Sequence, residues 1–184
     1  MVYLNDDIAG FDFEAALPLL SPQRREQALR FSHELGRKTC AAAYLLLRQA
    51  LEREYGIDSA PLFEYGEHGK PRLAGMPHIH FSLSHCRQAV ACVVSDRPVG
   101  IDIESIGRYS DALARYTMNA AELDAIGRAS RPDVAFVRLW TQKEAVLKLS
   151  GRGISGDMKD VLTGREQLET TGDPAGRYVD TVAR

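Results

Sequence analysis

Hydrophobic residues in the first third of the chain recur with the spacing of amphipathic helices. Residues 39–55, TCAAAYLLLRQALEREY, are rich in strong helix formers, and Gly56 directly after them is a common helix stop. A shorter helix is predicted from Ser21 and Pro22 to Arg30, because serine accepts hydrogen bonds from free N–H groups and proline suits the first helical turn. The positions of the long helix that we expect in the core are Tyr44, Leu45, Leu47 and Leu51.

Alternation of apolar and polar residues predicts the strands. Residues 78–83, HIHFSL, alternate as a strand does, and residues 88–94 and 99–104 follow as two further strands. The tetrapeptide SDRP between the last two indicates a hairpin or a short connection. Shorter strands are expected at residues 2–4, 62–65 and 177–183.

Two further helices are predicted in the second half, at residues 119–128 and at about 132–149. The longer one begins at Pro132 and ends before Gly151, which are favoured residues at these two positions. Helices and short strands in this order indicate an α+β fold made of α/β lobes. With 184 residues, 45% of them hydrophobic, the chain can bury the core of one ordinary domain or of two small lobes.

Charge excludes a general attraction to polyanions. The chain has 23 basic and 25 acidic residues and a formal net charge of -2, so neither nucleic acid nor an anionic membrane is an expected partner. An acidic ligand would need a local basic cluster. The sequence offers one near the first helices, at Arg24, Arg25, Arg30, Arg37 and Lys38, although a solvated helical face would look the same.

Cysteine usage and the N-terminus suggest a cytoplasmic protein. Cys40, Cys86 and Cys92 form no CxxC pair and are odd in number, which argues against a disulfide framework and a thiolate zinc site. We expect them to be small buried residues of a reduced protein. The first residues carry acids where a targeting segment would carry a basic region before an apolar one.

Two carboxylates share one face of the strand at residues 99–104. Strand geometry places Asp102 and Glu104 on one side and Ile101 and Ile103 on the other. Paired carboxylates are costly to ionise together unless a cation neutralises them, and such oxygen ligands suit Mg²⁺ held with a substrate phosphate. Taken alone, the motif is better explained as a solvated strand face.

A helix supplies a third acid and a lysine. Trp140, Glu144 and Lys148 follow one another at a spacing of four residues, so they lie on one helical face. A surface ion pair would explain the acid and the lysine by themselves. Together with Asp102 and Glu104, however, they are the parts that phosphoryl transfer needs: metal ligands, a proton acceptor and a cation for developing negative charge.

Histidines and serines offer weaker candidates. Ser84 and His85 end a predicted strand and could hydrogen-bond a phosphate, but without a partnered acid they are poor evidence for a hydrolase triad. His78 and His80 share a strand face, and two histidines without a third ligand are more often structural.

The order of these motifs resembles the 4'-phosphopantetheinyl transferases, in particular the pseudo-dimeric type that activates surfactin synthetase. The resemblance covers nearly the whole chain except its C-terminal region, and it depends on all the motifs together. The matching pieces are Ser21-Pro22, Arg30-Phe31, Lys38-Thr39, Gly69-Lys70-Pro71, residues 81–85, residues 99–104, Leu139-Trp140-Thr141, Lys143-Glu144-Ala145 and Lys148.

The resemblance implies a fold and a reaction. It implies the 4'-phosphopantetheinyl transferase fold, with two similar lobes at residues 1–98 and 99–184 related by a pseudo-twofold, a shortened C-terminal lobe, and coenzyme A between them. Such a pseudo-dimer would act as a monomer. The implied reaction moves the phosphopantetheine arm of coenzyme A to a serine of an acyl or peptidyl carrier protein, with Mg²⁺ required and 3',5'-ADP released.

The resemblance also implies roles for individual residues. By position, the Mg²⁺ ligands would be Asp102, Glu104 and Glu144. Glu144 would also activate the carrier serine, and Lys148 would stabilise or protonate the leaving 3',5'-ADP. Phosphate binding would fall to Arg24, Lys38 and His85, and nucleotide contacts to Lys70, Pro71 and Ser84. Gln27 stands where a second basic residue is common, so we expect weaker 3'-phosphate binding or a substitute role for Arg25 or Arg30.

Two other functions remain open at this point. An Asp-x-Glu strand followed by Glu and Lys also resembles restriction-type nucleases, but the net charge of -2 does not suit a polyanion. A coenzyme A or carrier-protein binding module without activity would share the motifs. We further expect a carrier protein to dock on basic and apolar surface beside the site, including Met118 and Leu123.

Overall fold

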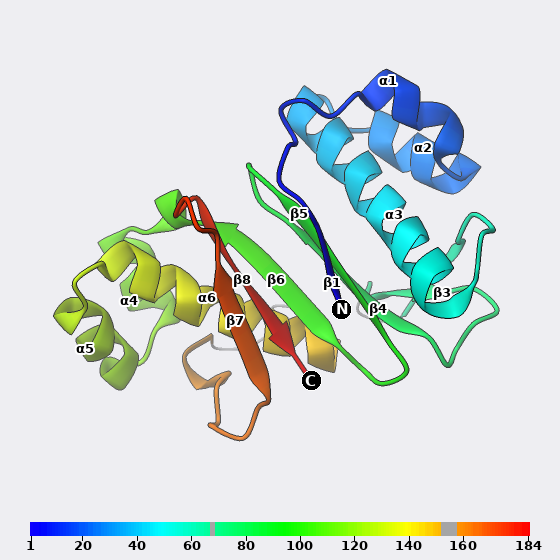
Figure 1. The fold of residues 1–184 in the computed structure, drawn as a ribbon. Helices are drawn as coiled ribbons and strands as arrows, with labels where there is room; N and C mark the ends of the chain where they lie inside the picture. Colours follow the sequence, from blue (N-terminus) through cyan, green and yellow to red (C-terminus); the bar gives the residue numbers. More distant parts are fainter. Residues whose placement is uncertain (67–68, 152–157) are drawn as a thin grey trace.

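The first half of the molecule is a three-stranded antiparallel sheet covered by a long helix. In the computed structural model, residues 1–66, 69–151 and 158–184 are described. The strand order is β1 (Val2–Asn5), β5 (Val90–Ser95) and β4 (His80–His85). Helix α3 (Glu34–Tyr55) crosses this sheet, with α1 (Phe13–Ala16), α2 (Pro22–Leu29) and the short β2 (Phe63–Tyr65) and β3 (Pro71–Leu73) ribbon around it (Figure 1).

The second half repeats the combination of three strands and a long helix. Its antiparallel order is β6 (Gly100–Ser105), β8 (Tyr178–Ala183) and β7 (Leu168–Gly172), with α6 (Pro132–Ser150) against the sheet. Helices α4 (Asp111–Thr117) and α5 (Ala120–Arg128) pack beyond α6. Short 3-10 turns occur at Leu17–Leu19, Ile106–Arg108 and Met158–Asp160.

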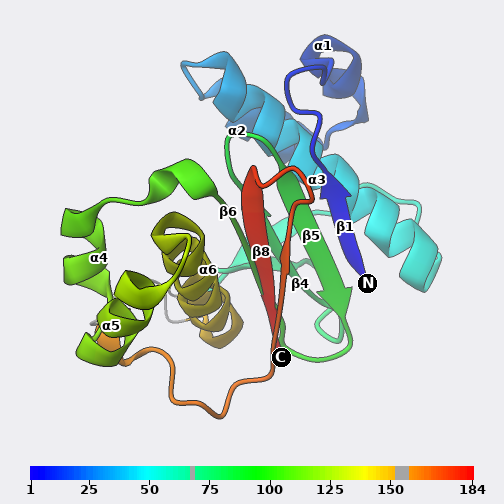
Figure 2. The same ribbon diagram turned by 60° about the vertical axis from the view of Figure 1, so that its left-hand side comes forward.

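The two sheets lie face to face between their helices, giving the layers α3, first sheet, second sheet and α6 (Figure 2). Alternation along each strand explains this arrangement. On β5, Val90 and Cys92 belong to the core beneath α3, whereas Ala91 and Val93 pack with Ile101 and Ile103 between the sheets. Strand β5 therefore buries both of its faces.

Serine side chains join β4 to β6. Ser82 Oγ accepts a hydrogen bond from the Ile101 N–H at 3.0 Å, and Ser84 Oγ accepts one from the Ile103 N–H at 3.2 Å. β6 pairs with β8 along one edge, and the serines satisfy donors on its other edge, where buried N–H groups need partners. The joint between the halves is thus built from β4 side chains and β6 backbone.

Gly100 permits close packing of α6 on β6. A Cβ atom at this position would lie 2.1 Å from the Ala145 carbonyl oxygen and 2.5 Å from the Leu149 backbone nitrogen. Only glycine allows a backbone approach of this kind without displacement. The contact brings the middle and the end of α6 against the strand that carries Asp102 and Glu104.

Most predicted elements are confirmed, with corrections at boundaries. The long helix α3 begins at Glu34 instead of residue 39, because His33 Nδ1 accepts the Gly36 N–H and caps it. The SDRP segment is a short connection and not a hairpin, since β5 and β6 belong to different sheets. Leu45 is partly buried, whereas its three companions are fully buried.

Other expectations are also settled. The three cysteines are buried and free. Helices α1 and α4 and strands β3 and β7 were not predicted from the sequence. Among the described residues, no helix has the length and apolar character that a membrane crossing requires.

Candidate functional site

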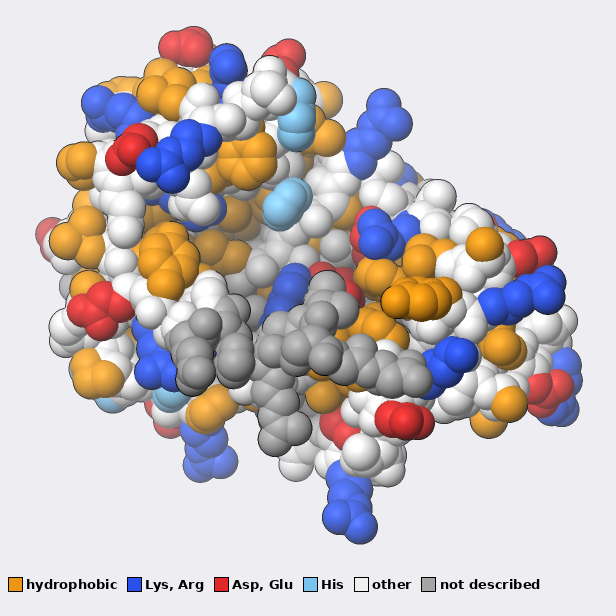
Figure 3. Space-filling view, turned by 180° about the vertical axis from the view of Figure 1, so that it is seen from behind, with side chains coloured by type: hydrophobic (Ala, Val, Ile, Leu, Met, Phe, Trp, Pro, Cys, Tyr) orange, Lys and Arg blue, Asp and Glu red, His pale blue; other side chains and the backbone are white. Residues whose placement is uncertain are grey.

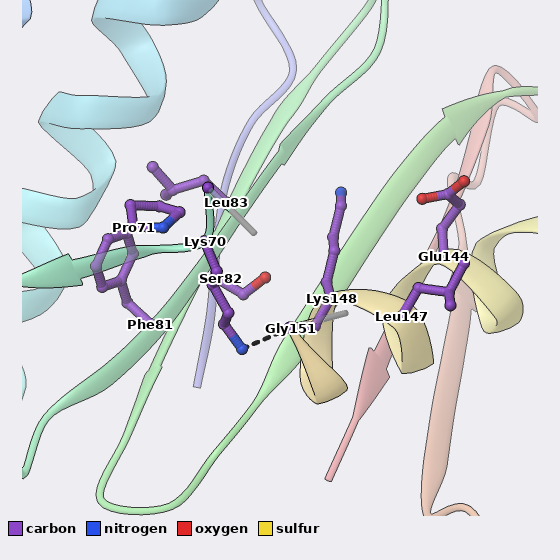
Figure 4. Close-up of a pocket in the computed structure, with 10 residues that line it drawn as sticks. Lys70, Pro71, Phe81, Ser82, Leu83, Glu144, Leu147, Lys148 and Gly151 are labelled. Carbon is purple, nitrogen blue, oxygen red and sulfur yellow. Dashed lines mark hydrogen bonds between the residues drawn. The ribbon is translucent and has the colours of Figure 1, made fainter. Parts of the chain in front are cut away.

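A cavity of about 310 Å³ lies between the two halves. Its wall comes from the β2–β3 ribbon, from β4 and from the last turns of α6. The residues around it are Gly69, Lys70, Pro71, Phe81, Ser82, Leu83, Glu144, Leu147, Lys148 and Gly151 (Figure 4). From behind, the surface is hollowed between the halves, and basic, acidic and histidine side chains gather there (Figure 3).

Lys148 connects the two halves through its ammonium group. Its Nζ donates to Asp102 Oδ1 and to Ser84 Oγ, each at 2.7 Å, and the Ser84 hydroxyl donates to the same Asp102 oxygen at 2.7 Å. Asp102 and Ser84 are both buried. A buried carboxylate requires such a cation and such donors. The structure therefore brings Asp102, Ser84 and Lys148 together, a contact that the sequence did not predict.

Glu104 points toward a different cation. Its Oε1 accepts the Ser105 N–H at 2.7 Å, and its Oε2 pairs with Arg108 at 3.2 Å. The Arg108 guanidinium carbon lies 4.4 Å from the centroid of the Trp140 ring, a cation–π distance. Burial raises the pKa of Glu104 above its usual range, and the Ser105 N–H and the Arg108 charge oppose that rise.

Glu144 lies one turn before Lys148 on α6 and is buried. Burial raises its pKa, the negative charge of Asp102 raises it further, and Lys148 and Arg108 oppose the change. A weaker repulsion comes from Glu104. Asp102 and Glu104 on β6 thus lie close enough to Glu144 on α6 to oppose its ionisation.

The three acids offer oxygen ligands suited to a divalent cation, but their carboxylates do not converge on one point in the structure. In the part of the chain that the structure describes, no three His, Cys, Asp or Glu side chains are close enough together to hold a metal ion. Asp102 is turned to Lys148 and Glu104 to Arg108. Carboxylate oxygens are the donors that Mg²⁺ prefers, and their partial neutralisation by two flexible cations is compatible with exchange for a metal. The donor set therefore fits a hard divalent cation.

His85 and Arg24 lie on the first-half side of the site. Desolvation lowers the pKa of His85, and the positive charges of Lys148 and Arg24 lower it further. Part of the His85 side chain still reaches solvent. Arg24 donates to the Cys40 carbonyl at 3.1 and 2.9 Å and to Gln27 Oε1 at 2.9 Å. Gln27 thus orients Arg24.

Lys38 is placed elsewhere. Its ammonium donates to the Ala9 carbonyl at 2.9 Å and pairs with Glu34 at 2.9 Å. It lines a separate hollow of about 400 Å³ together with Arg87. The structure therefore does not bring Lys38 to the wall of the cavity that holds Lys148.

Lys70 and Pro71 both line the cavity, but the Lys70 ammonium is engaged with helix α6. It donates to the Lys148 carbonyl at 2.5 Å and to the Leu149 carbonyl at 3.1 Å. Burial lowers the pKa of Lys70, and the neighbouring charge of Arg72 lowers it further. The chain separation of 78 residues hid this contact from sequence reasoning.

One further charged residue was missed. Lys143 is fully buried, and its ammonium donates to Glu122 Oε2 at 2.6 Å, to the Met158 carbonyl at 2.7 Å and to the Thr117 carbonyl at 3.1 Å. Its place on α6 directly before Glu144 was visible in the sequence. The sequence did not show that it faces inward, because lysine is rarely buried without a partner.

The expected docking surface requires a correction. Met118 is 1% exposed and packs in the core formed by α4, α5 and α6, so it cannot receive a partner at the surface. Leu123 is partly buried against the same core. The prediction for Met118 was wrong because this residue is the C-cap of α4, where its N–H bonds to the Ala114 carbonyl, and its side chain joins the core of the second half.

Acidic side chains and a lysine thus meet in a cleft between two helix-covered sheets. A sequence profile described as the 4'-phosphopantetheinyl transferase superfamily matches residues 98–181. The chain is similar to a 4'-phosphopantetheinyl transferase of Bacillus subtilis, with 30% identity over 158 residues that cover 84% of this chain and 70% of the relative.

Two other relatives agree. The 4'-phosphopantetheinyl transferase psf-1 of Bacillus pumilus is 35% identical over 83% of this chain and 66% of its own length. The 4'-phosphopantetheinyl transferase HetI of Nostoc sp. is 31% identical over 89% of this chain and 73% of its own length. The chain belongs to the 4'-phosphopantetheinyl transferase superfamily and is an enzyme of that class. The nuclease alternative is thereby set aside.

Proposed function

We propose that this chain transfers the 4'-phosphopantetheine group of coenzyme A to a serine of an acyl or peptidyl carrier protein, in a Mg²⁺-dependent reaction that releases 3',5'-ADP. The single observation that carries the proposal is the cluster of Lys148, Asp102 and Ser84, with Glu144 one helical turn away in the same cleft. Membership of the family supports the class of reaction.

Glu144 is the proposed proton acceptor. The carrier serine oxygen would form a bond to the β-phosphorus of coenzyme A as the serine proton passes to the Glu144 carboxylate, directly or through water. The bond from that phosphorus to the bridging oxygen of the α-phosphate would then break. The raised pKa of Glu144 supports this role, because a more basic carboxylate is a better general base at neutral pH.

Lys148 is the proposed partner of the leaving group. Its ammonium would donate a hydrogen bond or a proton to the bridging oxygen that departs with 3',5'-ADP. In the structure this ammonium is held by Ser84 and Asp102, which fix its position beside the cavity. A preorganised donor of this kind stabilises charge as it develops.

Asp102, Glu104 and Glu144 are the residues that would hold the metal. Mg²⁺, when bound, would supply positive charge that offsets the negative charge of the pyrophosphate. This chain's own cations would act with it. We assign phosphate contacts to Arg24, His85 and Lys38, and contacts to the nucleotide to Ser84, Pro71 and the backbone of Lys70.

We also propose that the chain divides into lobes at residues 1–98 and 99–184, related by a pseudo-twofold. The support is that each part contains a three-stranded antiparallel sheet and one long helix. Both walls of the cavity come from the same chain. A monomer would therefore suffice for activity.

The test is the release of 3',5'-ADP from coenzyme A, followed by chromatography, with an apo carrier protein present. We expect release that requires both Mg²⁺ and the carrier and that stops with EDTA. Binding of coenzyme A without release, across fatty-acid, polyketide and nonribosomal-peptide carriers, would instead support an inactive binding module and contradict the proposal.

A further inference from the structure

The carboxyl end of helix α6 is held by a lysine from the other half of the molecule. The last carbonyls of a helix lack intrahelical N–H partners and carry partial negative charge. In α6, the Gly151 N–H satisfies the Leu147 carbonyl at 3.0 Å, and Gly151 itself adopts a left-handed conformation with φ of 70°. The next carbonyl, that of Lys148, accepts a hydrogen bond from the Lys70 ammonium at 2.5 Å (Figure 4). The Leu149 carbonyl accepts a second one from the same ammonium at 3.1 Å.

The aliphatic part of Lys70 packs against the same helix end. A Cβ atom built on Gly151 would lie 3.2 Å from Lys70 Cδ, so the side chain runs directly across the helix terminus. Lys70 lies next to Pro71, the first residue of β3, in the half that also contains β4. The contact therefore joins the β2–β3 ribbon to α6 across the cavity that both elements line.

Lys148 is consequently tied to the first half twice. Lys70 binds its carbonyl oxygen, and Ser84 on β4 binds its ammonium at 2.7 Å. Glu144 lies one turn earlier on the same helix and lines the same cavity. Movement of the helix end would shift the two residues to which we assign proton transfer and leaving-group stabilisation.

We propose that Lys70 is a positioning residue: it clamps the end of α6 to the first half and so sets the places of Lys148 and Glu144 in the cleft. This inference rests on the proposed function for the roles of those two residues. It assigns the Lys70 ammonium to the protein backbone, whereas a direct phosphate contact would assign it to coenzyme A. The two roles differ in the ligand-free protein, where only a clamp has an effect.

We expect the fold to survive loss of the clamp, because other contacts also join the two halves. The halves remain joined by the serine contacts of β4 with β6 and by the ion pair of Arg177 with Asp6 at 2.5 Å. Lys70→Met keeps the aliphatic stem and removes the ammonium. Arg72→Met is the matched control. Arg72 is an exposed cation on the same ribbon, so its replacement removes the same charge and keeps the Lys70 ammonium.

The experiment compares hydrogen exchange and transfer kinetics for the wild type, Lys70→Met, Lys70→Arg and Arg72→Met. In the ligand-free protein, Lys70→Met should speed amide exchange over the last turn of α6 by about tenfold or more, because local opening becomes easier. It should lower kcat by about tenfold while KM for coenzyme A changes less than about threefold. Lys70→Arg, which retains a donor cation, should keep amide exchange and kcat close to the wild-type values. Arg72→Met should change neither amide exchange nor kcat.

Unchanged exchange in Lys70→Met, with a large rise in KM for coenzyme A, would overturn the clamp and make Lys70 a ligand residue. Exchange needs no turnover, so the result stays interpretable if the wild type transfers nothing to any carrier. Absence of transfer by the wild type would contradict the proposed function and leave the clamp untouched. Faster exchange in Lys70→Met would then still support the clamp, and unchanged exchange would still overturn it.

Discussion

At the scale of single residues, the site depends on how its charges are paired. Asp102 and Glu104 each face a cation in the structure, Lys148 and Arg108 respectively. Burial raises the pKa of Glu144, and the negative charge of Asp102 raises it further. We assign all three acids to the metal, and Glu144 alone to the additional task of accepting the serine proton.

Glu144→Gln tests the third role. The substitution keeps the size of the side chain and removes both the negative charge and the basic oxygen. We expect kcat for transfer to fall by about two to four orders of magnitude, the range of general-base effects, with a far smaller change in the Kd for coenzyme A measured by calorimetry. Retained turnover would mean that another group activates the serine.

At the scale of secondary-structure elements, the position of α6 determines the site, because this helix carries both Glu144 and Lys148. On one side it touches β6 at Gly100, and on the other it holds α4, α5 and the 3-10 turn at Met158–Asp160 through Lys143. Both contacts involve backbone atoms. Substitutions at either contact should shift α6, and with it Glu144 and Lys148, although the substituted residues do not contact substrate.

Gly100→Ala tests the contact with β6. The new Cβ would meet the Ala145 carbonyl at 2.1 Å, and backbone cannot move aside as a flexible side chain would. We expect a loss of about 1–3 kcal/mol in the free energy of unfolding, as in overpacked cores, together with reduced transfer. Gly107→Ala is the control, since nothing lies within 4 Å of its Cβ position. Equal stability of the two variants in urea unfolding would contradict the packing argument.

Lys143→Met tests the contact with α4 and α5. It would leave Glu122, whose side chain is 11% exposed, without its cation, and two carbonyls without their donor. Breaking a buried pair typically costs about 3–5 kcal/mol. We expect a loss of that size in chemical denaturation, and a much smaller further loss when Glu122→Gln is added. Additive losses would show that the two residues act independently.

Local patterns in the sequence predicted most of the long elements and the grouping of the acidic site residues. Period-two alternation placed Asp102 and Glu104 on one face, and helical spacing placed Glu144 beside Lys148. Contacts between distant segments could not be predicted, because no local pattern records them: Ser84 with Asp102 is one case and Lys70 with α6 is another. Strand β7, with the polar sequence LETTG, was missed because it lacks the apolar alternation that predicts strands.

At the scale of the whole molecule, one chain forms both sides of a cleft between two sheets. The first half contributes Ser84, Pro71 and Lys70, and the second contributes Glu144 and Lys148. The serine joint and the Lys70 contact fix the two halves relative to each other. Residues on both sides of the cleft therefore come from one chain.

The most direct test of the central claim is the intact mass of an apo acyl carrier protein after incubation with this protein, coenzyme A and Mg²⁺, beside a reaction with EDTA and one with Glu144→Gln. The account predicts a gain of one phosphopantetheine group per carrier with the wild type and Mg²⁺, and almost none in the other two reactions. An unchanged carrier mass, while coenzyme A still binds, would contradict transfer. An equal gain with EDTA would contradict the proposed binding of Mg²⁺ by the three acids.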